Sequence, residues 1–305
     1  MTLTTAPSLL LVHAHPDDET LWTGGTIARY AAAGARVTLV TCTLGEEGEV
    51  IPGELRGLAS DRADQLGGYR IGELSRACAA LGVTEQRFLG GIGRWRDSGM
   101  VWQEHGKTAT AAPRTHPRAL VAGDPAEQSA QLEAVLREVR PQVVVTYASD
   151  GGYGHPDHVR AHELTVAAVR RVPEVRRLFY ATPSAADLHE GLRRLAGVAE
   201  LPFPLPTADQ LPAVDPAGIT TAVDIADRLP AKLAALRAHR TQVRVWSDGA
   251  ADGSGTAAYA LSNGIGQPVS STEYYTLGYG DGTAPTTDLF GGLETTSERT
   301  GSGDE

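Results

Sequence analysis

The sequence has 305 residues, a length that fits one large domain or two small ones at about 100–200 residues each. Its 27 Lys and Arg residues and 37 Asp and Glu residues give a net charge of -10, which excludes a protein whose whole surface binds polyanions, so we expect no nucleic-acid partner. With two cysteines, Cys42 and Cys78, the chain has neither a disulfide framework nor a cysteine-based zinc cluster.

The first part of the chain alternates between apolar runs typical of buried strands and segments with helical spacing. In chain order we predict a strand at residues 9–12, a helix at 20–33, a strand at 37–42, a helix at 55–81, a strand at 87–89, a helix at 128–139, a strand at 143–147, a helix at 158–171 and a strand at 178–180. The long helix is expected to break at Gly67 and Gly68. Strands that alternate with helices form parallel sheets. We therefore predict an α/β fold, a Rossmann-like, doubly wound and mostly parallel sheet with helices on both faces.

The other segments are less regular. A surface loop or lid is expected at residues 103–123, a late helix at 229–239, and loops with short strands after Asp248. Residues 295–305 are rich in Ser, Gly and acidic residues and are expected to form a disordered tail.

No linker divides the chain, so we predict a single domain over residues 1–294. Within it, residues 9–181 form the α/β core, and 182–294 form an irregular α/β extension that packs on the core and completes a substrate pocket. No apolar stretch approaches the ~20 residues that cross a bilayer, and no basic leader precedes the first apolar run. We therefore expect a cytoplasmic protein with no membrane partner.

Two histidine-rich loops follow two of the predicted buried strands. Residues 13–19 read His-Ala-His-Pro-Asp-Asp-Glu, and residues 151–158 read Gly-Gly-Tyr-Gly-His-Pro-Asp-His. Because ligands bind beyond the carboxyl ends of parallel strands, we expect both loops at one edge of the sheet. His and Asp side chains bind Zn²⁺ or Fe²⁺, and catalytic sites use three protein ligands. His15, Asp18 and His158 are the candidate ligands.

Two further side chains in these loops suit hydrolysis. Asp17 is a spare carboxylate beside the ligands, and it is the candidate general base for a water molecule. His155 is the candidate proton donor or oxyanion-stabilising group. One His-Pro-Asp motif alone often caps a helix, but two at the ends of two buried strands favour a functional site.

The paired motifs, His-Pro-Asp-Asp-Glu and Gly-His-Pro-Asp-His, resemble those of the LmbE-like (PIG-L) superfamily of zinc-dependent N-deacetylases. Residues 42–50, 64–70 and 93–100 resemble the branch of that superfamily that acts in mycothiol biosynthesis and removes acetate from N-acetyl-glucosaminyl-inositol. The resemblance runs from about Leu9 through the Glu273-Tyr274-Tyr275 segment, which is nearly the whole chain.

The resemblance implies a role for each site residue and a small-molecule glycosyl-inositol as the partner. His15, Asp18 and His158 would bind Zn²⁺, with Fe²⁺ as the alternative metal, and Asp17 would be the base. His155 would act as acid or oxyanion donor, with Asp157 orienting it and Tyr153 assisting at the carbonyl. The residues expected to hold sugar or inositol hydroxyls are Arg70, Asp97, Glu49 and Asn263. His239 lies in a recurrent family segment, but the sequence assigns it no role.

Three alternatives stay open from the sequence. A mycothiol S-conjugate amidase, or another N-acyl-glucosamine deacetylase, would use the same scaffold and metal chemistry. A non-haem iron oxygenase would use the same two-His, one-carboxylate ligand types, although it has no need for Asp17. A non-catalytic polyol-binding protein would tolerate the loss of that carboxylate.

Overall fold

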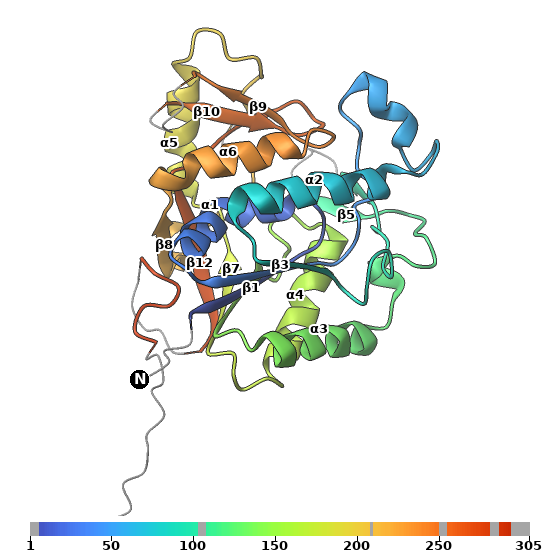
Figure 1. Cartoon of the computed structure of the whole chain (residues 1–305). Coiled ribbons are helices and arrows are strands. Elements are labelled where there is room, and N and C mark those ends of the chain that lie inside the picture. Colours follow the sequence, from blue (N-terminus) through green and yellow to red (C-terminus); the bar gives the residue numbers. More distant parts are fainter. Residues whose placement is uncertain (1–5, 103–107, 208–209, 250–254, 281–286, 294–305) are drawn as a thin grey trace, which may run out of the picture.

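The N-terminal part of the chain forms the centre of the main sheet, which Figure 1 shows between two layers of helices. The computed structural model describes residues 6–102, 108–207, 210–249, 255–280 and 287–293. Within these ranges, seven strands form the main sheet in the order β3-β2-β1-β6-β7-β12-β8. Its strands are β1 (Ser8–His13), β2 (Arg36–Thr41), β3 (Glu85–Phe88), β6 (Val143–Tyr147), β7 (Arg177–Ala181), β8 (Thr221–Asp224) and β12 (Thr272–Gly280).

Neighbouring strands from β3 to β7 are parallel, and β12 is antiparallel to both of its neighbours. The helices are α1 (Asp18–Ala32), α2 (Leu66–Leu81), α3 (Pro125–Val139), α4 (Pro156–Val169), α5 (Ala185–Ala196) and α6 (Leu229–Ala238). The predicted mostly parallel α/β sheet is thus confirmed.

Strand β1 shows how the sequence specifies the two layers. Its residues from Leu9 to Val12 have no exposed surface, and successive side chains of a strand point to opposite faces. Leu9 and Leu11 pack in the cluster that contains residues of α1 and α2. Leu10 and Val12 pack in the cluster that contains residues of α3 and α4. A run of apolar residues without alternation therefore forms a strand covered on both faces.

The expected break in the long helix lies elsewhere in the structure. A 3₁₀-helix spans Gly53–Leu58, and α2 begins only at Leu66. The chain between them turns at Asp64, whose φ is 53°. Gly67 lies inside α2, and a Cβ atom there would lie 2.7 Å from Cγ of Glu46. This glycine therefore permits a close approach and does not end the helix, so the predicted position of the break is wrong.

The C-terminal part of the chain contributes a long strand to the main sheet, where loops and short strands were expected. Strand β12 is nine residues long and pairs with β7, which corrects the expectation for the segment after Asp248. Helix α6 packs against α1 and α2 (Figure 1). A second sheet of three strands follows within the described ranges: β9 (Arg244–Ser247), β10 (Ala257–Ala260) and β11 (Gly266–Pro268).

The described part of the expected lid contains one strand, which pairs with a strand just before the lid, and a short helical turn. Strands β4 (Met100–Trp102) and β5 (Ala109–Ala111) pair, and the described part of the segment also holds the 3₁₀-turn Leu120–Ala122. The predicted tail at 295–305 lies outside the described residues. No helix within the described ranges is long and apolar enough to cross a membrane.

Candidate metal centre and active site

The two histidine-rich loops meet at the carboxyl ends of β1 and β6. These strands are adjacent and parallel, with Leu9 beside Val143. The chain continues from β1 to β2 on one side and from β6 to β7 on the other, which makes this place the topological switch point where α/β sheets bind ligands. The ring centroids of His15 and His155 lie 4.5 Å apart, and those of His15 and His158 lie 5.3 Å apart.

His158 lies in the first turn of α4 and is fixed on two sides. Its ring stacks on Tyr147 with centroids 4.1 Å apart. Its Nδ1 lies 3.1 Å from the carbonyl oxygen of Gly151, and because a carbonyl only accepts, Nδ1 carries the proton. Nε2 is buried without a hydrogen-bond partner. A buried imidazole with its lone pair free and its other nitrogen held by a carbonyl is the usual form of a metal-binding histidine.

Asp18 brings the other donor atoms together. Its Oδ2 lies 3.2 Å from Nδ1 of His15 and 3.3 Å from Nε2 of His158. Donors on a tetrahedral metal, with bonds near 2.1 Å, lie about 3.4 Å apart. Each of these two distances is therefore close to the separation expected for two donors that share a metal ion.

The Asp157 carboxylate supports His15 from the other side of the ring, 3.2 Å from Nε2. Although burial favours a neutral ring, the carboxylates of Asp97, Asp157 and Asp18 raise the pKa of His15 well above its usual value. Such a concentration of carboxylates around buried rings suits a cation.

Two groups of donors around His15 are close enough together to hold a metal. In the described part of the chain, donor atoms of His15, His155 and His158 lie within 4.8 Å of one another, as do those of His15, Asp97 and Asp157. The cluster could thus bind a metal. Its nitrogen and oxygen donors suit zinc or ferrous iron alike.

Asp17 sits beside this cluster in an unusual backbone conformation. Its φ is 126°, which typically costs about 1–3 kcal/mol for a residue other than glycine. Its side chain makes no cap to α1 and lies 3.2 Å from the Arg70 guanidinium. Burial raises the pKa of Asp17 to about 6, and Arg70 acts against that rise. The carboxylate is therefore able to exchange a proton near neutral pH.

His155 and Tyr153 border the cluster, each with its ring centroid 5.0 Å from that of His158. His155 is the N-cap of α4, and its Nδ1 accepts from the backbone N–H of Asp157 at 3.1 Å. Burial and the nearby His15 hold the pKa of His155 well below 6.5, so the ring is neutral with its proton on Nε2. Burial also raises the pKa of Tyr153 well above 10, which keeps its hydroxyl protonated.

The Asp157 carboxylate contacts other groups than the His155 ring that it was expected to orient. Besides His15, it accepts from the backbone N–H of Ser98 at 2.9 Å and from the Ser98 hydroxyl at 2.5 Å. The hydrogen bond between Asp157 and the His155 ring is made by the Asp157 backbone N–H, which donates to Nδ1. Ser98 was not predicted as a site residue from the sequence. It lies in the segment at residues 93–100 that resembles the mycothiol-biosynthesis branch of the superfamily.

Arg70 is placed behind Asp17, with 2% of its surface exposed. It donates to the carbonyl oxygens of Gly45 and Pro16. Gly45 has a φ of 68°, and a Cβ atom there would overlap the guanidinium. The glycine thus permits Arg70 to reach Asp17.

The other residues expected to hold hydroxyls are spread more widely. Asp97 is buried, accepts from the backbone N–H of Gly99, and lies 3.6 Å from Nε2 of His15. Glu49 and Asn263 are exposed, and Asn263 accepts from the backbone N–H of Ile265. No hydrogen bond or ion pair joins these two side chains to the other predicted site residues, all of which the structure describes.

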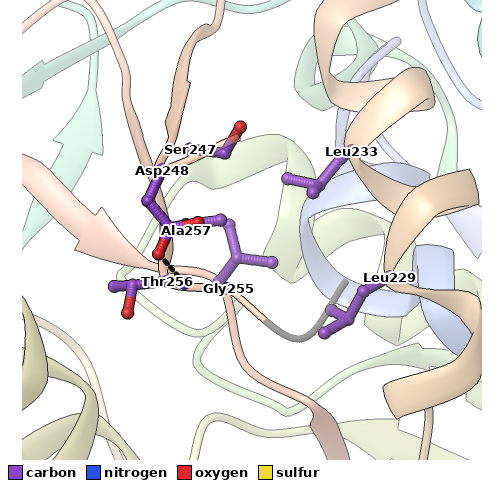
Figure 2. A pocket seen from close by; sticks show the side chains of 8 residues that line it. Leu229, Leu233, Ser247, Asp248, Gly255, Thr256 and Ala257 are labelled. Atoms are coloured by element: carbon purple, nitrogen blue, oxygen red, sulfur yellow. Dashed lines mark hydrogen bonds between the residues drawn. The ribbon is translucent and has the colours of Figure 1, made fainter. Parts of the chain in front are cut away.

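A small pocket elsewhere has no part in this cluster. It lies between α6 and the strands β9 and β10, and Figure 2 shows the side chains around it. The lining residues are Leu229, Leu233, Ser247, Asp248, Gly255, Thr256, Ala257 and Val269. None of the predicted site residues is among them.

The doubly wound sheet and the His/Asp cluster define an α/β protein with a candidate metal centre of the hydrolytic kind. The profile of the PIG-L family, described as GlcNAc-PI de-N-acetylase, matches residues 10–169. The chain therefore belongs to the PIG-L family. The expectation of an N-deacetylase of this family is confirmed.

Curated relatives match nearly the whole chain. A protein of Saccharopolyspora erythraea, named 1D-myo-inositol 2-acetamido-2-deoxy-alpha-D-glucopyranoside deacetylase 1, is 64% identical over 293 residues, covering 96% of each chain. A protein of Actinosynnema mirum with the same name, without the final number, is 62% identical, covering 96% of this chain and 99% of the relative.

Solved structures share the fold. GalB, the 4-carboxy-2-hydroxymuconate hydratase from Pseudomonas putida KT2440, has a TM-score of 0.51 at 18% identity, covering 91% of this chain and 98% of that chain. This likeness shows the fold alone, because one fold supports different reactions.

Proposed function

We propose that the chain hydrolyses the acetamide of 1D-myo-inositol 2-acetamido-2-deoxy-alpha-D-glucopyranoside, a step of mycothiol biosynthesis that releases acetate and the free amine of glucosaminyl-inositol. One observation carries the proposal: the Asp17 carboxylate, with its pKa near 6, lies beside a cluster that fits a metal. The relatives that are 64% and 62% identical bear the name of this activity, which supports the choice of substrate.

The proposed metal is Zn²⁺, with Fe²⁺ as the alternative, held by His15, Asp18 and His158. When bound, the metal supplies Lewis-acid polarisation and lowers the pKa of water at the site. Asp157 supports this set by holding Nε2 of His15, so that Nδ1 faces Asp18.

The reaction then depends on proton transfers by the surrounding side chains. Asp17 takes a proton from the water that attacks the acetamide carbon. The carbonyl oxygen becomes negative as that bond forms, and the Nε2–H of His155 and the hydroxyl of Tyr153 donate to it. Asp17 then returns its proton to the leaving nitrogen, the carbon–nitrogen bond breaks, and acetate and amine are released.

The substrate hydroxyls are proposed to bind Asp97, Glu49 and Asn263. Arg70 remains a proposed site residue, and its burial behind Asp17 favours action through that carboxylate. The cytoplasmic location and the absence of nucleic-acid and membrane partners remain predictions.

The test is release of acetate and free amine from the glycosyl-inositol by the purified chain, before and after chelation and after Zn²⁺ or Fe²⁺ is added back. We expect activity that chelation abolishes and the metal restores. A matched assay uses a mycothiol S-conjugate. Cleavage of that conjugate without acetate release from the glycosyl-inositol would replace the proposal with the amidase alternative.

A further inference from the structure

Two fully buried residues connect the C-terminal part of the chain to Asp17. The Glu19 Oε2 accepts the backbone N–H of Asp17 at 2.9 Å, and its Oε1 lies 2.7 Å from Nε2 of His239. His239 is the residue that follows α6. Neither Glu19 nor His239 has any exposed surface, so neither touches a substrate in this conformation.

The Glu19 carboxylate holds the part of the backbone that is strained. Asp17 precedes α1, and its carbonyl oxygen accepts from the N–H groups of Thr20 and Leu21. Its own N–H points back to Glu19, as in a capping box in which an acidic side chain of the first turn reaches the cap residue. The positive φ of Asp17 lies between these two attachments, so they fix the direction in which its side chain leaves the chain.

We propose that Glu19 and His239 are positioning residues, which hold Asp17 in its working conformation so that the end of α6 controls the general base. This inference rests on the proposed function for its catalytic consequence. It assigns a role to His239, which the sequence left without one.

A different buried residue of α6, Lys232, attaches this helix to the core. Lys232 of α6 pairs with Glu273 at 2.6 Å, both buried, and Glu273 accepts the N–H groups of Gly25 and Thr26 in α1. This second pair attaches α6 to α1 and β12 without any contact to Asp17. It therefore provides a matched control.

The test uses the variants His239→Gln, His239→Asn and Lys232→Met in the full chain. A Gln amide nitrogen can occupy the position of Nε2 and donate to Glu19, whereas the shorter Asn cannot reach it. For each variant we measure exchange of the Asp17 amide hydrogen, metal content, thermal unfolding, and kcat and KM for acetate release.

In His239→Asn we expect the Asp17 amide to exchange about tenfold faster or more. Its kcat should fall on the order of 10²-fold, with KM and metal content unchanged. His239→Gln should restore most of both properties. Lys232→Met should lower the unfolding temperature but leave the exchange of Asp17 and kcat near those of the original chain.

The proposal is overturned if His239→Asn leaves the Asp17 amide protected, or if Lys232→Met lowers kcat as much as His239→Asn does. The exchange measurement needs no substrate. If the original chain releases no acetate, the proposed function fails, and the exchange of Asp17 in the three variants still decides whether His239 positions it.

Discussion

The two loops that meet at the metal cluster are held in place by different kinds of contact. In the loop at residues 148–158, His158 is fixed by the carbonyl of Gly151, and His155 by the N–H of Asp157, both within the loop or the turn that follows it. In the loop at residues 13–19, Asp17 is held by the distant Arg70 of α2 and by its neighbour Glu19, which is itself held by the distant His239.

The difference between local and distant contacts follows from the glycine content of each loop. Gly151, Gly152 and Gly154 all have positive φ, so the second loop can turn sharply at little steric cost and direct its histidines locally. The first loop has no glycine and carries the strain on Asp17 itself, which then needs distant partners. The candidate ligand His158 is therefore held by local contacts, whereas the candidate base Asp17 depends on distant parts of the fold.

Among the variants that test the difference between the two loops, we expect the largest effect from removal of the Asp17 carboxylate. This substitution deletes the group that the distant contacts hold. For Asp17→Ala we expect kcat to fall about 10²–10⁴-fold, the usual contribution of general acid–base catalysis. Metal content should stay unchanged, as measured by elemental analysis of the purified variant. Loss of the metal would make Asp17 a ligand and reverse the roles assigned to the first loop.

A substitution of Arg70 breaks one of the distant contacts and leaves the carboxylate in place. For Arg70→Met we expect kcat to fall about 10–10²-fold, because small displacements of a reacting group have effects of this size, with KM changed little. Steady-state kinetics distinguish this positioning role from the expectation that Arg70 binds sugar or inositol hydroxyls. A higher KM at unchanged kcat would show that it binds substrate hydroxyls.

A substitution in the second loop tests the local kind of contact. In Gly151→Ala the new Cβ atom would lie 2.7 Å from Cβ of His158, at a φ of 66°. We expect metal affinity to fall about 10–100-fold, as for other groups that orient a metal ligand. Titration with Zn²⁺ measures this. The control is Gly34→Ala, which has a similar φ of 84° and no heavy atom within 4 Å of the added Cβ. Equal metal affinity in both variants would contradict the local role of Gly151.

The same division explains which features could be predicted from the sequence. The parallel core strands and the meeting of His15 with His158 follow from apolar runs and from the geometry of parallel sheets. Each of these signals, an apolar run or a His-Pro-Asp motif at the end of a strand, can be recognised within a short segment of the sequence. The contacts of Glu19 with His239 and of Asp157 with Ser98 join segments with no pattern in common, so spacing gives no signal for them.

The position of β12 shows the same limit. The segment after Asp248 contains many glycines, so loops with short strands were expected, and the nine-residue length of β12 follows from its pairing with β7 and β8, which local composition does not reveal. The roles of the exposed Glu49 and Asn263 in substrate binding were predicted from the resemblance alone, and they stay predictions.

Glu273 has a consequence for how the chain folds. The family profile ends at residue 169, yet two backbone N–H groups inside α1 bind a carboxylate on β12. A fragment that stops at residue 169 would lack this acceptor and would expose to water the face of α1 that α6 covers, so the burial that stabilises α1 would be lost. We therefore predict that the matched segment does not fold by itself, and that the loop at residues 13–19 and the C-terminal strands unfold in a single cooperative transition.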